Sequence, residues 1–183
     1  MKKVVSVLLA MVLVWTLAGA GAETARYEDA QTGVSFMPPD GWTEVENTSG
    51  NDSVRAIYMV PGYNGMVIIQ YAMMDFYTLS NMSGTGKARE DVDFGSLTED
   101  MVKMMFSPAE VTALERKEIG GNEFYMARCM IDDSMIAAGI SVDTESAVTM
   151  KNGYVIMFQY IVSEKFDEFL PVFEGVLETV EIK

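Results

Sequence analysis

Three cationic side chains have the chemistry to bind an anionic ligand. Lys87 and Arg89 lie in a long polar stretch, residues 76–95, and Arg128 alternates with apolar residues along an expected strand. Ammonium and guanidinium groups donate charge-assisted hydrogen bonds to carboxylates and phosphates. For Arg128 three environments are open: a strand face that reaches solvent at a sheet edge, an acidic partner, or an anionic ligand. These three cations are the candidate ligand contacts.

Two amides are the lone polar residues in the two most apolar segments of the chain. Gln70 lies within residues 66–74, and Gln159 lies within residues 154–162. Buried polar groups normally find hydrogen-bond partners. The two amides are therefore expected to hydrogen-bond each other across a sheet; the alternative is that they mark a binding pocket.

The chain lacks residue types that several kinds of catalysis need. It contains no histidine, which excludes Ser-His and Cys-His nucleophilic pairs and the commonest zinc sites. Residues 83–87 resemble the end of a phosphate-binding loop, but Asn81 stands where the first glycine is required and Ala88 where the serine or threonine is required. We expect no catalytic residue and no cofactor.

Potential metal ligands occur in patterns that favour other roles. Residues 90–95 lack the third acid and the closing glutamate of a calcium loop, so a solvated acidic segment is favoured over weak calcium binding. Met101, Met104 and Met105 could bind Cu(I) through their thioethers, but their helical spacing favours packing against the core. Cys129 is the only cysteine, so it forms no internal disulfide, and we expect it to be buried. No metal site is predicted.

The N-terminus has the pattern of an export signal. Lys2 and Lys3 precede an apolar run, and small residues at 18–22 match a cleavage site. An uncleaved membrane anchor is the alternative. We expect a signal peptide over residues 1–22, a single domain over residues 23–183, and a secreted or extracytoplasmic location. No cysteine follows the apolar run, so no lipid attachment of the bacterial lipoprotein type is expected.

The chain is strongly acidic. Its formal net charge is −14, and loss of the two lysines of the leader would make it −16. Such a surface repels nucleic acid and anionic membranes. We therefore expect no nucleic-acid partner and no stable membrane insertion after signal cleavage.

Hydrophobic patterns predict an α+β fold. Residues 66–74 and 154–162 are apolar in both alternating sets, and a strand apolar on both faces needs cover on both. Amphipathic helices are predicted over residues 97–105 and 166–180. Pro171 is expected to make the second helix start near Glu168 or to kink it there. Residues 76–95 are expected to be irregular. Shorter strands are expected at residues 34–36, 54–60, 111–119, 123–131, 136–142 and 146–150. These elements predict an α/β/α sandwich with a central antiparallel sheet covered by helices on both faces.

Several turns and aromatic residues resemble those of PsbP-like domains. The segment Gly33–Phe36 followed by Pro39–Trp42 resembles the opening of that family. The resemblance continues in the hairpin around Gly120-Gly121 and in the closing strand and helix, and so covers most of Tyr27–Lys183. It implies the same α/β/α sandwich and no enzyme activity. Functional positions that involve histidine cannot be carried over, because this chain has none.

These observations predict an exported, non-enzymatic accessory or binding protein whose partner is a protein. The alternative is an extracytoplasmic carrier of a small molecule or an ion, using the region under residues 76–95 with Arg128, Lys87 and Arg89 as anion contacts. A hydrolase would need two carboxylates facing one cleft, which the sequence does not place.

Overall fold

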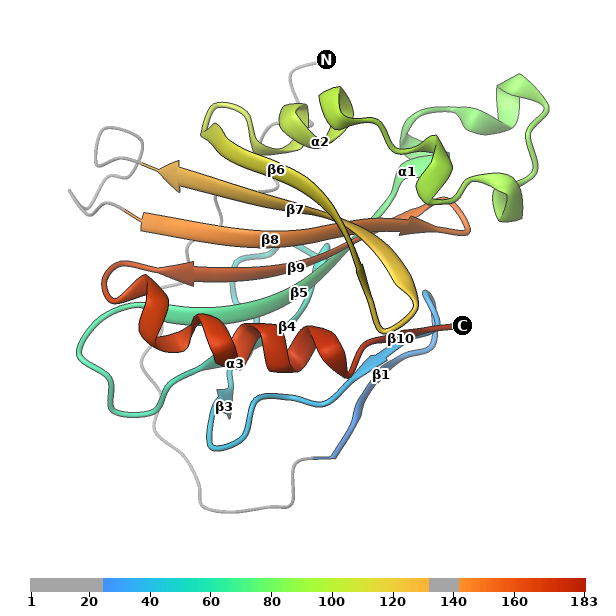
Figure 1. Cartoon of the computed structure of the whole chain (residues 1–183). Coiled ribbons are helices and arrows are strands. Elements are labelled where there is room, and N and C mark those ends of the chain that lie inside the picture. The colour runs from blue at the N-terminus through green and yellow to red at the C-terminus, as the bar shows by residue number, and fades with distance from the viewer. Residues whose placement is uncertain (1–24, 132–141) are drawn as a thin grey trace.

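The computed structural model describes residues 25–131 and 142–183, which form two antiparallel β-sheets and three short α-helices (Figure 1). The larger sheet has seven strands in the order β3-β4-β5-β9-β8-β7-β6, and the smaller has three in the order β1-β2-β10. The strands are β1 (Tyr27–Asp29), β2 (Val34–Phe36), β3 (Thr43–Glu44), β4 (Val54–Met59), β5 (Val67–Asp75), β6 (Glu110–Ile119), β7 (Asn122–Ile131), β8 (Val142–Lys151), β9 (Tyr154–Val162) and β10 (Glu181–Ile182). The helices are α1 (Phe76–Leu79), α2 (Glu99–Phe106) and α3 (Phe166–Glu178).

The two strands that are apolar on both faces lie side by side at the centre of the larger sheet. β5 and β9 pair in one register from Val67 opposite Val162 to Asp75 opposite Tyr154. Most of their residues are buried on both faces, because each strand has neighbours on both sides and cover above and below. The prediction of two buried central strands in an antiparallel sheet is confirmed.

One face of the larger sheet is covered by α3 together with the smaller sheet (Figure 1). The side chains on this face include the fully buried aromatic rings of Tyr71, Phe158 and Tyr160. Phe36 from β2 contacts Phe158 edge to face, with 5.2 Å between ring centroids, and Phe173 from α3 stacks on Tyr160 at 5.8 Å. The helix and the smaller sheet therefore share one core.

The opposite face is covered mainly by α2 and by short 3-10 turns. The apolar residues that these segments bury against the sheet are Val92, Phe94, Leu97, Val102 and Phe106. They pack on Tyr125, Ala127 and Cys129 of β7 and on Val155 of β9. Residues 76–95, expected to be irregular, contain α1 and 3-10 turns at Met82–Thr85 and Arg89–Asp91.

The predicted α/β/α sandwich is wrong. The described residues form ten strands and only three short helices, and neither face of the sheet carries a continuous helical layer. The prediction assumed that a strand with two apolar faces needs helices on both sides. Burial requires apolar cover of any kind, and here a second small sheet supplies part of it on one face while short turns supply part of it on the other.

Two helix details also differ from expectation. Val102 and Phe106 form the buried side of α2, while Met104 is 68% exposed, so the three methionines do not all face the core. Pro171 lies inside α3, which begins at Phe166. The strand expected at 136–142 falls outside the described residues, apart from Val142, which begins β8. Among the described residues, no helix is long and apolar enough to cross a membrane.

Cys129 provides a test of core packing. It is 1% exposed on β7, and burial raises the pKa of its thiol to about 11. Because the thiolate is the reactive form, we expect iodoacetamide at pH 8 to label the folded protein at least about 100-fold more slowly than the unfolded protein. Mass spectrometry measures the single label. Rapid labelling of the folded protein would contradict the packing of β7 under α2.

Candidate functional site

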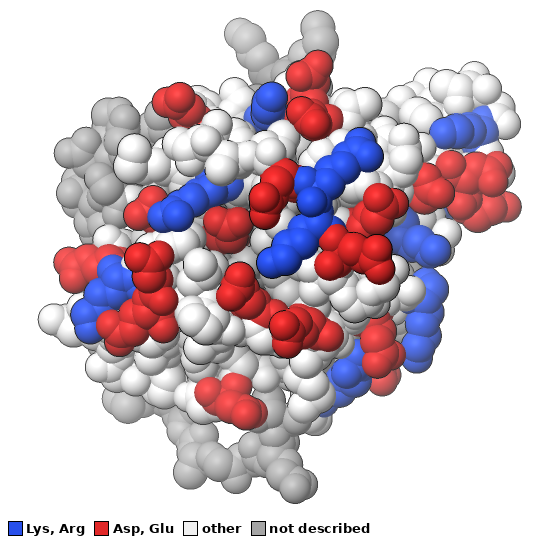
Figure 2. Space-filling view, in the orientation of Figure 1, with Lys and Arg blue, Asp and Glu red and all other residues white. Residues whose placement is uncertain are grey.

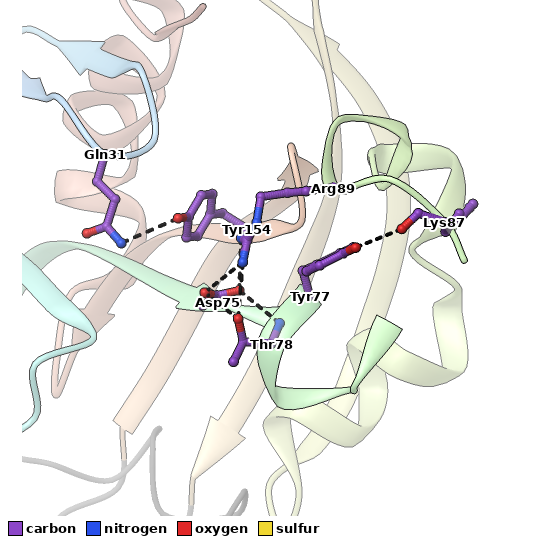
Figure 3. A network of polar contacts seen from close by, with 7 residues as sticks. All are labelled: Gln31, Asp75, Tyr77, Thr78, Lys87, Arg89 and Tyr154. Carbon is purple, nitrogen blue, oxygen red and sulfur yellow. Dashed lines mark hydrogen bonds and ion pairs between the residues drawn. The ribbon is translucent and has the colours of Figure 1, made fainter. Parts of the chain in front are cut away.

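Arg89 is the centre of a compact polar cluster at one end of β5 and β9 (Figure 3). Its two terminal nitrogens donate to the two carboxylate oxygens of Asp75 at 3.0 and 3.1 Å, and one of them also donates to Thr78 Oγ1 at 3.1 Å. The guanidinium carbon lies 4.7 Å from the ring centroid of Tyr77 and 4.9 Å from that of Tyr154. Bidentate ion pairing and cation–π contact fix the guanidinium group in one place.

The cluster joins segments that are far apart in the sequence. Asp75 ends β5, and its carboxylate accepts the Thr78 N–H at 3.0 Å, which caps α1. Tyr77 OH donates to the Lys87 carbonyl at 2.7 Å, and Gln31 Nε2 donates to Tyr154 OH at 3.5 Å. These contacts hold together four separate parts of the chain, as Figure 3 shows: residues 31, 75–78, 87–89 and 154.

Gly153 lets the β8–β9 turn approach this cluster closely. Its N–H donates to the Val92 carbonyl at 2.6 Å, and its carbonyl accepts the Tyr77 N–H at 2.9 Å. Its φ is +72°, and a Cβ at this position would lie 2.6 Å from the Cβ of Tyr77. A residue with a side chain would have to push Tyr77 away, so glycine is required both for the turn and for the contact.

The electrostatics of the cluster favour ionised partners. Burial alone would raise the pKa of the Asp75 carboxyl, but hydrogen bonds from Arg89 and Thr78 outweigh it, so the pKa lies below its usual range. The hydrogen bonds to Asp75 likewise raise the pKa of Arg89. The charge of Arg89 is therefore satisfied within the protein, and the residue acts as a clasp that fastens residues 76–89 to the sheet.

Asp75→Asn tests this clasp through its pH dependence. A depressed folded-state pKa stabilises the protein above the unfolded-state pKa, about 3.9 for Asp, and this contribution disappears as the pH falls through the folded-state value. Both side chains are about one-third exposed, so the loss at pH 6 should be at most about 1 kcal/mol. Urea unfolding should show that the variant and the parent converge at pH 2.5. The exposed Asp40→Asn serves as control. A gap that persists at pH 2.5 would contradict this role of the carboxylate.

Gln70 and Gln159 form a hydrogen-bonded pair across the two central strands. Gln70 Nε2 donates to Gln159 Oε1 at 2.6 Å, and Gln159 Nε2 donates to Ser146 Oγ at 3.3 Å. The expected amide pair is confirmed. The pair lies on the sheet face away from α3, between an apolar cluster around Ile68 and another around Val155. Its role as a ligand contact stays a prediction.

Arg128 lies on the other face of the sheet. Its guanidinium carbon is 3.9 Å from the ring centroid of Phe166 at the start of α3, and its register partner on β8 is Glu145. Burial raises the pKa of the Glu145 carboxyl, and the positive charge of Arg128 partly opposes that shift. Of the three environments considered for Arg128, the structure thus provides an acidic neighbour, together with an aromatic surface to stack on.

The five predicted residues do not form one site. Lys87 and Arg89 meet at Tyr77, and the Lys87 ammonium donates to Ser96 Oγ at 3.1 Å. The two glutamines form a separate pair, and Arg128 lies on the opposite face of the sheet. Asp75 and Tyr154 were not predicted from the sequence as members of the site. Asp75 had a usable signal, because an Asp three residues before Thr at the end of an apolar strand fits a helix N-cap; Tyr154 had none.

Over residues 25–131 and 142–183, no group of three or more Cys, Asp or Glu side chains is arranged to hold a metal ion. The acidic residues 90–95 instead belong to short turns. Asp93 accepts the Gly95 N–H at 3.1 Å, and Val92 and Phe94 are buried. Residues 90–95 therefore help to cover one face of the sheet.

Solved structures with a similar fold have been found. The solution structure of cyanobacterial PsbP (CyanoP) from Synechocystis sp. PCC 6803 matches with a TM-score of 0.57 and 17% identity, covering 93% of this chain and 99% of that one. A crystal structure from Bacteroides thetaiotaomicron VPI-5482 matches with a TM-score of 0.51 and 14% identity, covering 82% of this chain and 45% of that one. At these identities the likeness concerns the fold. None of the curated proteins matches the chain.

The sequence itself matches a family model. The model is that of PsbP, and the match extends over residues 22–180. It contains the larger sheet, β1 and β2 of the smaller sheet and all three helices described above, and it ends just before β10. The chain belongs to the PsbP family.

Proposed function

We propose that this chain is an extracytoplasmic accessory protein that binds a protein partner and catalyses no reaction. Family membership is the observation that carries the proposal, because PsbP-like proteins are in general extracytoplasmic or lumenal and have accessory or unassigned roles. The match begins at residue 22, where the expected leader ends. The acidic surface supports a protein partner over a nucleic acid.

The contacts of the candidate cations favour a protein partner over a carried small molecule. Arg89 is engaged by Asp75, Thr78 and two tyrosine rings, and Lys87 bonds to Ser96. An anion would have to compete with these internal partners. Arg89 and Lys87 therefore have internal partners that support the proposal over the carrier alternative.

Co-purification tests the proposal directly. The full-length gene, tagged at its C-terminus and expressed in the source organism, is cross-linked and recovered from the extracytoplasmic fraction beside an unrelated exported bait. We expect one polypeptide in near-stoichiometric amount that the control bait lacks. Recovery of the protein with no such polypeptide, under several growth conditions, would contradict the proposal.

A ligand screen tests the carrier alternative. The purified protein is heated with phosphate, sulfate, small carboxylates, Ca²⁺ and Cu(I), each in parallel with an Arg128→Gln variant. We expect no change in melting temperature with any of them. A rise that the variant abolishes would assign an anion site to Arg128 and favour the carrier.

A further inference from the structure

Strand β6 forms a long open edge of the larger sheet. Among the described residues it pairs on one side only, with β7. It has ten residues, whereas β3 at the other end of the sheet has two. From Ala113 to Glu118 every side chain is exposed except Leu114, which is half-buried. Such an edge presents backbone N–H and C=O groups to which another strand can add.

Two features of β6 restrict which strand can pair with it. A bulge interrupts the register between Val111 and Ala113, and charged residues of both signs occupy positions 115–118. Bulges and charges at an edge prevent indiscriminate pairing. Charges of both signs still admit a strand whose own charges are complementary, because opposite charges directly across a strand pair stabilise it and like charges destabilise it.

We propose that the complementary strand is β6 of a second copy of this chain, paired antiparallel about a two-fold axis at Arg116. In this register Glu115 of each copy lies opposite Lys117 of the other, so the contact contains the same attractive pair twice. At each end of the contact, Ala113 of one copy lies opposite Ile119 of the other. Two residues that lie opposite each other in an antiparallel pair have their side chains on the same face of the sheet. Because side chains alternate between the faces along a strand, a two-fold axis can pass only through a residue and not between two residues.

The neighbouring registers are less favourable. Centring the axis on Glu115 would place two glutamates opposite each other, and centring it on Lys117 would oppose two lysines. In the register centred on Lys117, Arg116 of one copy would lie opposite Glu118 of the other. This pair is attractive, but Arg116 would have to leave its present partner to form it. Arg116 is already engaged: its Nε and one terminal nitrogen donate to Tyr125 OH at 3.0 and 2.5 Å.

The same engagement of Arg116 makes it tolerable on the axis. Its guanidinium carbon lies 4.9 Å from the ring centroid of Tyr125 and 5.4 Å from that of Phe94, so the charge is drawn back over its own sheet. Lys117 is freer. Its ammonium is 3.9 Å from Glu174, and both side chains are about half exposed. It can turn to meet Glu115 of a second copy at little cost.

The whole-molecule charge predicts how salt affects this contact. Each copy carries a formal charge of −14, or −16 without the leader, so two copies repel each other. Figure 2 shows acidic and basic side chains intermingled on the face that carries α3, without a large field of one sign. Because physiological salt screens exposed charges beyond about 8 Å, it should weaken the overall repulsion more than the close pairs. Association should therefore strengthen between low and physiological salt.

Exchange of the two charges tests the register. The protein, expressed from its full-length gene and purified as the cell processes it, is compared with Glu115→Lys and Lys117→Glu by sedimentation equilibrium at about 0.1 mM, where a contact with a Kd of that order is about half formed. We expect the parent to dimerise and each variant to weaken the dimer roughly tenfold or more, because each opposes like charges twice. An equimolar mixture of the two variants should regain the dimer, since every pair is again attractive.

The outcomes separate this contact from others. A parent that is monomeric at this concentration overturns the proposal. So does a dimer that both variants retain, which would use another surface, or a mixture that stays monomeric, which would exclude this register. Circular dichroism and urea unfolding of each variant show whether a lost dimer reflects lost folding. The result does not depend on a partner of another kind, so it can fail while the proposed function holds.

Discussion

Replacing Phe158 with alanine should destabilise the protein by about 3–5 kcal/mol, the range found when a large buried aromatic side chain is truncated. The ring is fully buried on β9, with Phe36 and Tyr71 each 5.2 Å away between centroids. Removing it opens a cavity between the central strand and the smaller sheet. Urea unfolding followed by tyrosine and tryptophan fluorescence measures the loss.

The control for this prediction is Leu79→Ala. Leu79 is 65% exposed at the end of α1, so its truncation should change the unfolding free energy by less than about 0.5 kcal/mol. Equal effects of the two substitutions would contradict the shared core of the two sheets, because only Phe158 lies in that core.

Gln159→Leu should destabilise the protein by about 1–3 kcal/mol, because it leaves the half-buried Gln70 without its amide partner. Adding Gln70→Leu should recover a large part of that loss, since two apolar side chains can then pack against each other between β5 and β9. A double-mutant cycle of unfolding free energies gives the coupling. Strictly additive effects would show that the amides act independently.

Sequence periodicity was sufficient to place the centre of the fold. Residues 66–74 and 154–162 are apolar in both alternating sets, and β5 and β9 are the adjacent central strands with both faces buried. The amide pair could be predicted for the same reason, because a lone glutamine in each of two central strands needs a partner inside the sheet.

The covering layers could not be predicted in the same way. A buried strand demands apolar neighbours but does not specify their secondary structure, and Val34 and Phe36 of β2 look like any short strand in the sequence. Only the pairing of β2 with β1 and β10, which joins the two ends of the described chain, creates the smaller sheet. β1 and β2 form a local hairpin, but the pairing of β2 with β10 is a long-range contact with no local signal.

The role of Arg89 was hidden for a related reason. In the sequence it is a cation in a polar stretch, which suggests an anion site. Its partners Asp75 and Tyr154 are opposite each other in the register of β5 and β9, so they come together only when those strands pair. Arg89 does bind a carboxylate, as an anion contact would, but the carboxylate is that of Asp75 in the same chain.

The proposed function requires a protein partner for this chain. The most direct test is the mass and composition of the native complex that holds this chain in the extracytoplasmic fraction of its own organism. We predict a species heavier than a dimer of the chain, containing a second polypeptide in fixed stoichiometry. Recovery only as the monomer or the self-paired dimer would contradict the proposed function.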